Sequence, residues 1–391
     1  MLHTSDFGFM LPRELIASHP LEQRDASRML VVGADENQPL ADKHIRDFIS
    51  YLRPGDVVVF NNSKVIPARF TASGREFTLH TAVTKNSWWG FCKKLRKVRK
   101  GAVFTMPDGT EFKIVDKNEE SGLLLKFKCD NVFDVLDKYG KMPLPPYMKR
   151  KEEIEDRTRY QTVYAGPLGS MAAPTAGLHF TNELIGEIKR AGAKVVKVTL
   201  HVGAGTWMSV KTENLDEHKM HSEWCCINLR EARIINKAKR VIAVGTTSLR
   251  ALESAHKVAV KAGKNKRVLP ICQKTDIFIT PGYKFGAVDV LLTNFHLPRS
   301  TLFMLVSAFS GLDEMKAAYS HAVAEKYRFF SYGDCCLLFK KTTEDNWADE
   351  ISSDDNQTEE NLSDEILLPN NEHEEVSDKE TQSEEDLTEN E

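Results

Sequence analysis

Short runs of alternating hydrophobic and polar residues recur at intervals of about ten residues between positions 71 and 139. They cover 76–83, 88–93, 102–106, 111–115 and 123–128, and turn sequences such as Pro107–Asp108–Gly109 separate them. Alternation with a period of two is typical of strands, and several short strands at this spacing favour a barrel or a sandwich. The pattern predicts a small all-β unit that ends in a short helix over 131–139.

Elsewhere, patterns typical of strands and of helices take turns. Apolar stripes predict helices over 181–191, 228–239, 247–261 and around 312–323, and apolar runs predict strands over 56–60, 194–202, 240–245, 277–280 and 288–293. Strands that alternate with helices favour a layered α/β domain. Because a strand precedes the β unit and the others follow it, we expect an α/β domain made of residues 1–70 and 140–342, with a β-barrel domain of residues 71–139 inserted in it.

The acidic residues of the chain are concentrated at its C-terminus. Residues 343–391 hold 20 Asp and Glu and one lysine, so the remaining 342 residues carry a net charge of +16 although the whole chain carries −3. The tail has few aliphatic residues and is predicted to be disordered. A body of this charge attracts polyanions, and nucleic acid is the first candidate. The alternative is a basic surface that its own tail keeps soluble.

Several classes of protein are excluded. The longest apolar run, 301–309, is too short to cross a bilayer, and the N-terminus has no basic region typical of a secretion signal. Seven cysteines without C-x-x-C spacing favour a reduced, cytoplasmic protein without a disulfide framework. The chain contains no P-loop, no complete dinucleotide fingerprint and no G-x-S-x-G elbow.

One loop has the composition of an anion site. Thr246, Thr247 and Ser248 follow a buried strand and begin a helix, and Arg250 comes two residues later. Hydroxyls and unpaired backbone N–H groups at a helix start hold anions well, whereas a plain helix cap needs only one hydroxyl. We therefore weigh a ligand site equally with a cap.

Histidines recur beside small-residue turns. His179 ends the loop 172–180, and His201 ends a strand before Gly203–Ala204–Gly205. His218 and His221 would share a face if their segment were helical, and Glu223 follows them. Each histidine alone is more often structural than catalytic, but two of them beside glycine-rich turns are a stronger signal, because in open α/β sheets ligands bind at the carboxyl ends of strands. Zinc is the alternative, but no cysteine or H-E-x-x-H helix accompanies these histidines, so we expect no metal.

Three further stretches carry chemistry-bearing residues. Residues 293–301 contain His296 and Arg299 among hydroxyls, residues 19–28 contain Arg24, Asp25 and Arg28, and residues 329–334 hold aromatic rings that could stack on a base.

Together these stretches resemble a known family. D-F-x-F-x-L-P-x-E-L-I-A near the N-terminus, H-P-L-E-Q-R-D-A-S-R, F-N-N-S-K-V-I-P-A-R, A-A-P-T-A-G-L-H-F-T, L-H-V-G-A-G-T-W, V-G-T-T-S-L-R-A-L-E-S and T-N-F-H-L-P-R-S-T-L follow one another in order. The chain resembles the S-adenosylmethionine:tRNA ribosyltransferase-isomerases of queuosine biosynthesis from residue 6 to about residue 338. The segment 73–80 matches the family's first barrel strand only loosely, and the acidic tail has no counterpart.

The resemblance implies a three-layer α/β sandwich with an inserted barrel, and an enzyme without metal or further cofactor. Such enzymes move the ribosyl part of S-adenosylmethionine onto the 7-aminomethyl-7-deazaguanine base at the tRNA wobble position, giving epoxyqueuosine, adenine and methionine. The expected catalytic residues are His179, His201, His221 and Glu223. The expected substrate-binding residues are Arg24, Asp25, Arg28, Thr246, Thr247, Ser248, Arg250, His296 and Arg299.

The expected partners are the tRNA anticodon arm and S-adenosylmethionine, and we expect a monomer that contacts no membrane. Two other classes remain open. A non-catalytic tRNA-binding protein would bind tRNA without turnover, and a His-centred, metal-dependent nucleotide hydrolase would require bound metal.

If the positive body binds tRNA mainly through phosphates, affinity will fall steeply with salt. We predict that log K falls by about 0.7–0.9 per phosphate neutralised for each tenfold increase in salt, measured by filter binding. A flat salt response would contradict phosphate-dominated binding.

A second hypothesis is that the acidic tail competes with tRNA for the same basic face. Unchanged tRNA affinity after deletion of residues 343–391 would contradict it.

Overall fold

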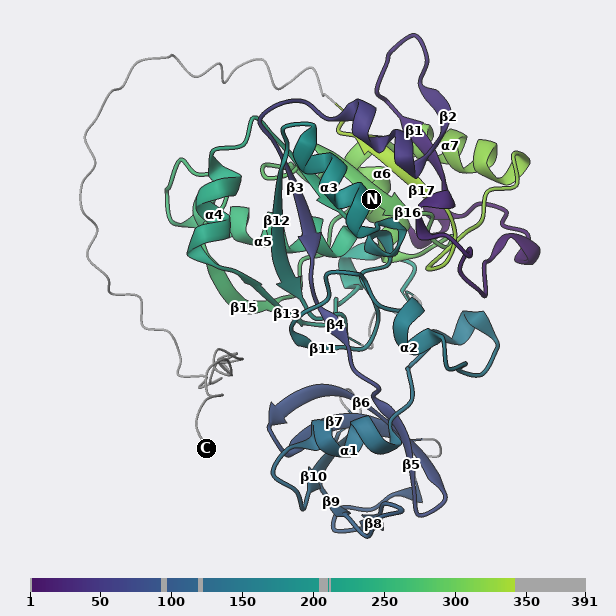
Figure 1. Cartoon of the computed structure of the whole chain (residues 1–391), viewed down its shortest axis with the longest axis vertical. Helices are drawn as coiled ribbons and strands as arrows, with labels where there is room; N and C mark the ends of the chain where they lie inside the picture. Colours follow the sequence, from purple (N-terminus) through teal and green to yellow (C-terminus); the bar gives the residue numbers. More distant parts are fainter. Residues whose placement is uncertain (1, 93–96, 119–121, 204–209, 211, 342–391) are drawn as a thin grey trace, which may run out of the picture. The chain divides into compact units, whose positions relative to one another are not determined.

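The computed structural model describes residues 2–92, 97–118, 122–203, 210 and 212–341 (Figure 1). The helices are α1 Val132–Tyr139, α2 Asp156–Arg159, α3 Asn182–Arg190, α4 Leu229–Asn236, α5 Thr246–Lys261, α6 Thr301–Ser310 and α7 Leu312–Ala324. The strands are β1 Arg28–Val32, β2 Leu40–His44, β3 Asp56–Asn61, β4 Lys64–Val65, β5 Arg69–Ala72, β6 Arg75–Thr84, β7 Ser87–Cys92, β8 Val103–Thr105, β9 Glu111–Asn118, β10 Gly122–Phe127, β11 Leu168–Ser170, β12 Lys194–Leu200, β13 Glu223–Ile227, β14 Arg240–Val244, β15 Ile271–Thr275, β16 Val290–Asn294 and β17 Cys335–Phe339.

A nine-stranded sheet forms the centre of the α/β part. Its strand order is β15-β13-β12-β3-β14-β16-β17-β1-β2. β12, β3, β14 and β16 run parallel, β17 runs antiparallel to β16, and β1 pairs parallel with β17. Every residue of β3 is buried. Strands that are apolar throughout, rather than alternating, are typical of sheets covered on both faces.

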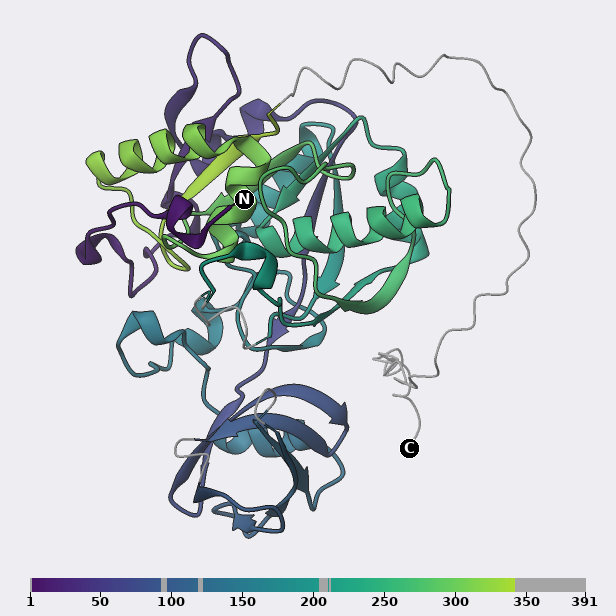
Figure 2. The same ribbon diagram turned by 180° about the vertical axis from the view of Figure 1, so that it is seen from behind.

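Helices cover both faces of this sheet (Figures 1 and 2). Val58 and Phe60 of β3 pack with Phe180 and with Leu184 of α3 on one face. Val57 and Val59 belong to the cluster on the other face, which includes apolar residues of α4, α5, α6 and α7. Alternate residues of one strand thus face opposite helical layers, which confirms the three-layer α/β architecture.

The six-stranded sheet forms a nearly closed barrel in the order β5-β6-β7-β10-β9-β8. Its interior is a separate cluster that contains Phe70, Phe77 and Phe112. At its seam, Ser73 N donates to Thr105 O at 3.1 Å and Thr105 N donates to the Ser73 hydroxyl at 3.0 Å. The five predicted strands are present, and β5 is an addition. It pairs with β6 through a turn in which Ser73 and Gly74 both have positive φ, 46° and 72°.

Some expectations from the pattern are wrong. The apolar residues of 277–280 lie in an extended segment outside any strand, because Ile277 and Ile279 are buried in the helical layer rather than paired in a sheet. The edge strand is β15 instead. Residues 218–222 are not helical, so His218 and His221 do not share a helix face. Cys226 and Cys272, which are register partners on β13 and β15, form a disulfide, so not every cysteine is free.

The short apolar run 301–309 forms α6, which is buried mainly in the cluster on one face of the sheet. No helix in the described part of the chain is long and apolar enough to cross a membrane. The predicted disorder of 343–391 concerns residues outside those that the structure describes, as do Ala204 and Gly205 of the glycine turn.

The central sheet should dominate stability. We predict that Leu292→Ala lowers the free energy of unfolding by about 2–5 kcal/mol, because Leu292 on β16 is fully buried and the truncation leaves a cavity. Val260→Ala on α5, where the side chain is 63% exposed, should change it by less than about 0.5 kcal/mol. Urea unfolding measures both, and equal effects would contradict this account of the core.

Candidate active site

The parallel strands bring polar residues together at one edge of the nine-stranded sheet. β3, β12, β14 and β16 end at this edge, and β1 and β17 begin there. We call it the carboxyl edge. It holds the polar side chains of Asn61 and Asn294, at the ends of β3 and β16, and that of Asp334, just before β17. Asn61, Asn294 and Asp334 are buried.

A loop of small residues crosses this edge from one strand end to another. Met171 N donates to Val202 O beyond β12 at 2.9 Å. Ala176 lies against Gly245 beyond β14, where an added Cβ would be 3.6 Å from that of Ala176. His179 then reaches Asn294 at the end of β16. The loop therefore aligns sites that lie on three separate strand ends.

His179 is buried and held at both ring nitrogens. Its Nδ1 is 2.8 Å from the hydroxyl of Ser27, and the side-chain amide nitrogen of Asn294 is 3.1 Å from its Nε2. Because the amide donates, Nε2 accepts and the ring proton sits on Nδ1. Burial, and then the nearby positive charges of Arg328 and Arg24, lower the pKa of His179 to about 4. The ring is therefore neutral near pH 7.

His201 is held at one nitrogen only. Its Nδ1 is 2.7 Å from the hydroxyl of Ser63, and the ring stacks on Trp224 with centroids 5.3 Å apart. An added Cβ at Gly169 would lie 2.9 Å from Nε2, so the tip of the ring packs against the glycine backbone. Burial lowers the pKa of His201 to about 4. A neutral ring with one nitrogen available can accept a proton.

Glu223 and Arg250 form a buried ion pair beside His201. Glu223 Oε2 pairs with Arg250 Nη1, and its Oε1 accepts from Gly203 N at 2.8 Å. Arg250 is only 5% exposed, and its Nη2 is buried without a hydrogen-bond partner among the described residues. An unpaired buried guanidinium donor is costly, so this nitrogen marks a place for a bound acceptor.

The start of α5 supplies further donors. Gly245, with φ 89°, precedes the helix and offers no side-chain cap. Ser248 donates back to Val244 O, at the end of β14, at 2.8 Å, so its hydroxyl is already used. The Thr247 hydroxyl is buried and has no partner among the described residues, and Thr246 is buried as the first helical residue. The backbone N–H groups of this first turn favour a negatively charged group.

A small cavity of about 20 Å³, enough for about one water molecule, lies beside His179. Its walls include Arg24, Ser27, Arg159, His179 and Tyr332. Arg24 donates to the backbone oxygens of Thr158 and Leu178, and Arg159 donates to those of Leu21 and Glu22. Neither arginine forms an ion pair within the described part of the chain, so the cavity wall keeps its positive charge.

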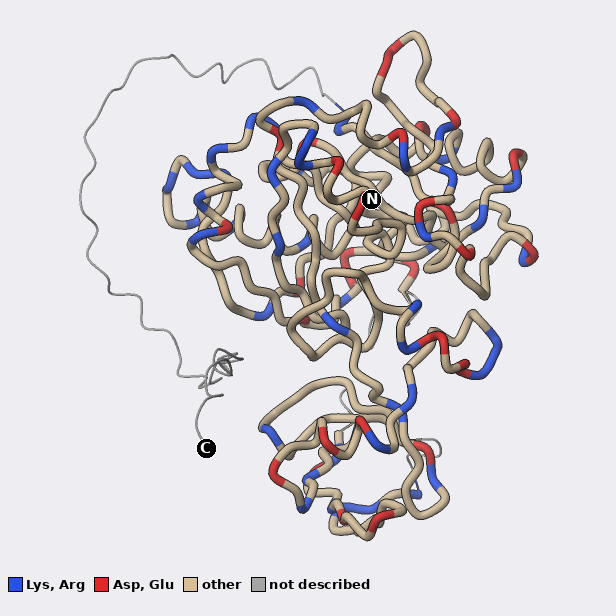
Figure 3. Tube along the Cα trace, viewed as in Figure 1, with Lys and Arg blue, Asp and Glu red and all other residues tan. Residues whose placement is uncertain are grey.

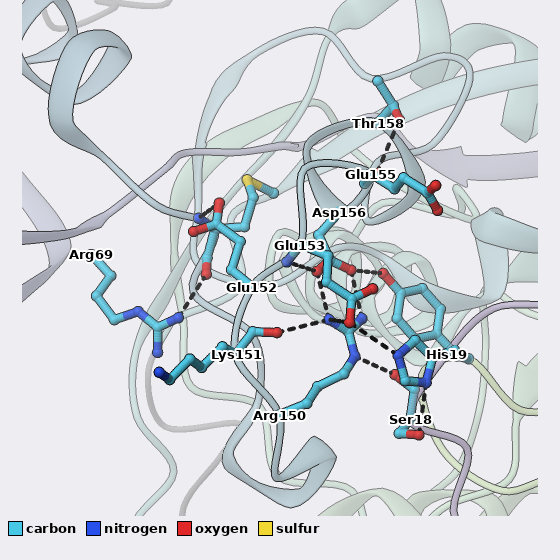
Figure 4. A network of polar contacts seen from close by, with 12 residues as sticks. Ser18, His19, Arg69, Arg150, Lys151, Glu152, Glu153, Glu155, Asp156 and Thr158 are labelled. Atoms are coloured by element: carbon cyan, nitrogen blue, oxygen red, sulfur yellow. Dashed lines mark hydrogen bonds and ion pairs between the residues drawn. The ribbon is translucent and has the colours of Figure 1, made fainter.

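A buried carboxylate fixes this wall in place (Figure 4). Asp156 accepts from both terminal nitrogens of Arg150, at 2.7 and 2.6 Å, and from the hydroxyl of Tyr332 at 3.1 Å. Burial acts to raise the pKa of Asp156, but these hydrogen bonds outweigh it and the pKa is lowered. Arg150 also donates to Ser18 O at 2.8 Å. The network thereby joins segment 150–159 to the N-terminal segment and to Tyr332.

Other predicted site residues lie outside this cavity wall. His221 is exposed. Asp25 pairs with Arg46 at 3.0 Å, and Arg28 stacks on Tyr327 and pairs with Asp42 at 3.4 Å. His296 is buried against Thr293 and the hydroxyl of Tyr319, and burial lowers its pKa to about 3. Arg299 is exposed, with a positive φ of 58°.

Sequence reasoning did not single out several residues that the structure places here. Ser27, Asn294 and Tyr332 lie inside stretches that were noted, but polar serine and asparagine at strand ends are usually structural. Ser63 follows a buried strand in the same way. Tyr164, packed on Phe60, has a buried hydroxyl without a partner among the described residues. A signal existed only for Asn294, an amide directly after three apolar residues and a threonine.

The alternative of a zinc site receives no support from the part of the chain that the structure describes. There, no group of three or more His, Cys, Asp or Glu side chains is close enough to hold a metal ion.

Comparisons with known proteins agree with one another. A family model described as "Queuosine biosynthesis protein" matches residues 4–338. A protein of Parvibaculum lavamentivorans named S-adenosylmethionine:tRNA ribosyltransferase-isomerase is 49% identical over 354 residues, covering 86% of this chain and 99% of its own. Proteins of the same name from Rickettsia bellii and Rhodospirillum rubrum are 49% and 45% identical, over 86% and 85% of this chain and 99% and 96% of theirs. A crystal structure of S-adenosylmethionine tRNA ribosyltransferase from Thermotoga maritima is 33% identical, with a TM-score of 0.48, over 85% of this chain and 100% of that one.

The buried histidines should make stability depend on pH. The pKa of His179 and His201 is lowered to about 4 and that of His296 to about 3, whereas unfolded histidine titrates near 6.5. The unfolded chain therefore binds more protons between these values, so stability is complete above about pH 6.5 and falls as the pH is lowered toward 4. We predict that His296→Gln shows a smaller loss between pH 7.5 and pH 5 in urea unfolding.

The matched control is His44→Gln, since His44 is exposed. It should keep the pH dependence of the unsubstituted protein. An identical pH dependence in the His296 variant and the unsubstituted protein would show that this ring is not held neutral.

Proposed function

The chain belongs to the queuosine biosynthesis protein family, and from this membership we propose that it is an S-adenosylmethionine:tRNA ribosyltransferase-isomerase. The enzyme transfers the ribosyl part of S-adenosylmethionine to the 7-aminomethyl-7-deazaguanine base at the wobble position of tRNA. The ribosyl group is rearranged, epoxyqueuosine is formed, and adenine and methionine are released. The observation that carries this conclusion is the family match over 4–338, which includes every polar residue described at the carboxyl edge.

The donor's amino-acid end fits the region between α5 and Glu223. S-adenosylmethionine carries a carboxylate and an ammonium group at this end. Arg250 Nη2, the Thr247 hydroxyl and the first backbone N–H groups of α5 are donors for the carboxylate. Glu223 is the acceptor for the ammonium group or the sulfonium. The buried ion pair that it forms with Arg250 keeps each charge in place before the substrate arrives.

The chemistry requires a base before it requires an acid. The sulfonium acidifies the adjacent C5′ protons, and adenine leaves more readily when a ring nitrogen is protonated. A histidine with a pKa of about 4 is neutral at pH 7 and begins as a base. Once it has taken the C5′ proton it is a strong donor, and the same proton can pass to adenine. Such positioned transfers typically contribute about 100- to 10,000-fold each.

His201 is better suited to this shuttle than His179. Its one hydrogen bond within the described part of the chain is at Nδ1, whereas both nitrogens of His179 are engaged by Ser27 and Asn294. We assign His179 a positioning role in the cavity wall. His221 is exposed in the structure, and a role for it depends on contact with bound tRNA.

We place the modified base beside His179. The cavity there has room for about one water molecule, so the base enters only when the surrounding loops move apart. Arg24 and Arg159 provide unpaired positive charge for an adjacent phosphate, and Tyr332 provides an aromatic edge.

The remaining assignments follow from the same proposal. The barrel, which with β5 begins at Arg69 rather than at residue 71, is an inserted domain with its own core, and the anticodon arm is the part of tRNA that is bound. The enzyme works in the cytoplasm, as a monomer, with S-adenosylmethionine as its only small-molecule requirement.

We predict that the protein, mixed with S-adenosylmethionine and tRNA carrying the 7-aminomethyl base, releases adenine, measured by chromatography. Release should require the modified tRNA, because its neutral amine is the acceptor, and should continue in the presence of chelator. Tight tRNA binding without adenine release would indicate a binding protein, and loss of activity with chelator would indicate a metal-dependent hydrolase.

Substitutions of two neighbouring hydroxyl residues test where S-adenosylmethionine binds. Thr247→Val removes a buried hydroxyl that has no protein partner, and we predict that KM for S-adenosylmethionine rises about 5- to 10-fold, the worth of one hydrogen bond. The control Ser248→Ala removes a hydroxyl that bonds Val244 O, and KM should stay within about twofold. If the two variants behave alike, the donor does not bind at this helix start.

A further inference from the structure

Lysines and arginines of several connecting segments lie at the edge of the nine-stranded sheet opposite the active site (Figure 3). We call this surface the amino edge and define it by the exposed residues Lys189, Arg190, Lys194, Arg230, Arg233, Lys237, Lys239, Lys257, Lys261, Lys264 and Lys266. They lie on or beside the end of α3, the start of β12, α4, the end of α5 and the loop before β15. Five chain segments thus present eleven cations.

Hydrogen bonds tie these segments into one surface. Asn236, at the end of α4, exchanges two hydrogen bonds of 2.9 Å with the backbone of Val268. This joins the segment of Lys237 and Lys239 to the loop of Lys264 and Lys266. Lys239 N donates to Gly55 O at 3.1 Å, which joins the same segment to the turn before β3. The backbones of these segments are therefore held together, although the lysine side chains on them are exposed.

Two carboxylates at this edge already pair with other cations, and Glu187 pairs with Arg190 of the set at 3.8 Å. Asp56 is buried and pairs with Arg240 at 2.6 Å, and Asp289 pairs with Arg267 at 2.5 Å. Lys237, Lys239, Lys261, Lys264 and Lys266 form no ion pair within the described part of the chain. Their charge is uncompensated, and like charges held close together are destabilising unless a polyanion neutralises them.

The spread of these cations favours a nucleic-acid backbone over a small anion as the ligand. The cations are spread along several segments, and most are lysines on exposed, flexible stems rather than arginines converging on a pocket. A nucleic-acid backbone presents regularly spaced phosphates over such a length. The strands between the two edges have five to seven residues, so the edges are about 17–23 Å apart. An RNA whose base enters the active site can extend this far.

We propose that the amino edge binds the sugar–phosphate backbone of tRNA, at a distance from the nucleotide that reacts. This proposal rests on the proposed function for the identity of the RNA. The surface contributes affinity and salt dependence, and it contributes nothing to the chemical step.

The test is the fourfold variant K237A/K261A/K264A/K266A, measured with full-length protein. Binding of unmodified tRNA is followed by filter retention from 50 to 300 mM salt. We expect Kd at low salt to rise at least tenfold and the slope of log K against log salt to fall by about 3, which is 0.7–0.9 for each of four contacts. At saturating modified tRNA, kcat should not change.

A matched variant controls for net charge. K43A/K85A/K113A/K126A removes four exposed lysines from β2 and the barrel, and its Kd should change much less. Unchanged binding in the amino-edge variant, or an equal loss in both variants, would overturn the proposal. Because unmodified tRNA cannot react, its binding tests the amino edge whether or not the enzyme turns over, and adenine release tests the proposed function separately.

Discussion

The central strands of the nine-stranded sheet are covered on both faces, and this constraint determines where chemistry can occur. β3 has no exposed residue, and its alternate side chains serve two different apolar layers. Polar groups can therefore approach the middle of the sheet only where strands end. Because β12, β3, β14 and β16 run parallel, their last residues meet at one edge. The loop that carries His179 closes this edge by hydrogen bonding to strand ends rather than by packing on a helix.

Burial at this edge lowers the pKa of both histidines. Desolvation lowers the pKa of His179 and His201, so neither is charged at neutral pH. The same burial leaves Arg250 and Thr247 with donors that no described residue satisfies. A fold that only needed stability would not retain such donors, because each costs about 1–3 kcal/mol. Neutral bases beside unsatisfied donors are suited to a cationic substrate that also carries a carboxylate and gives up a proton.

Much of this arrangement could be predicted from the sequence. Period-two and 3.6-residue patterns located the barrel strands, α3, α5 and β14 because each buries one face or one stripe. They failed at 277–280, where extended residues pack without a sheet partner, and could not detect the Cys226–Cys272 contact, which depends on the register of two strands. The motifs located the loops of His179, His201 and Arg250. They could not show that the Ser248 hydroxyl bonds Val244 O or that Asn294 holds His179, since both depend on side-chain direction.

The central claim is that the carboxyl edge is where S-adenosylmethionine and the base meet. Nitrogen NMR of protein with ¹⁵N-labelled histidine rings tests it most directly, with shifts assigned by single His→Gln variants. On addition of S-adenosylmethionine at pH 7, the ring signals of His201 and then of His179 should move, while those of His44 and of buried His296, whose ring lies 3.1 Å from the Thr293 hydroxyl, should not. Saturable binding that leaves the His201 and His179 signals unchanged would contradict the account.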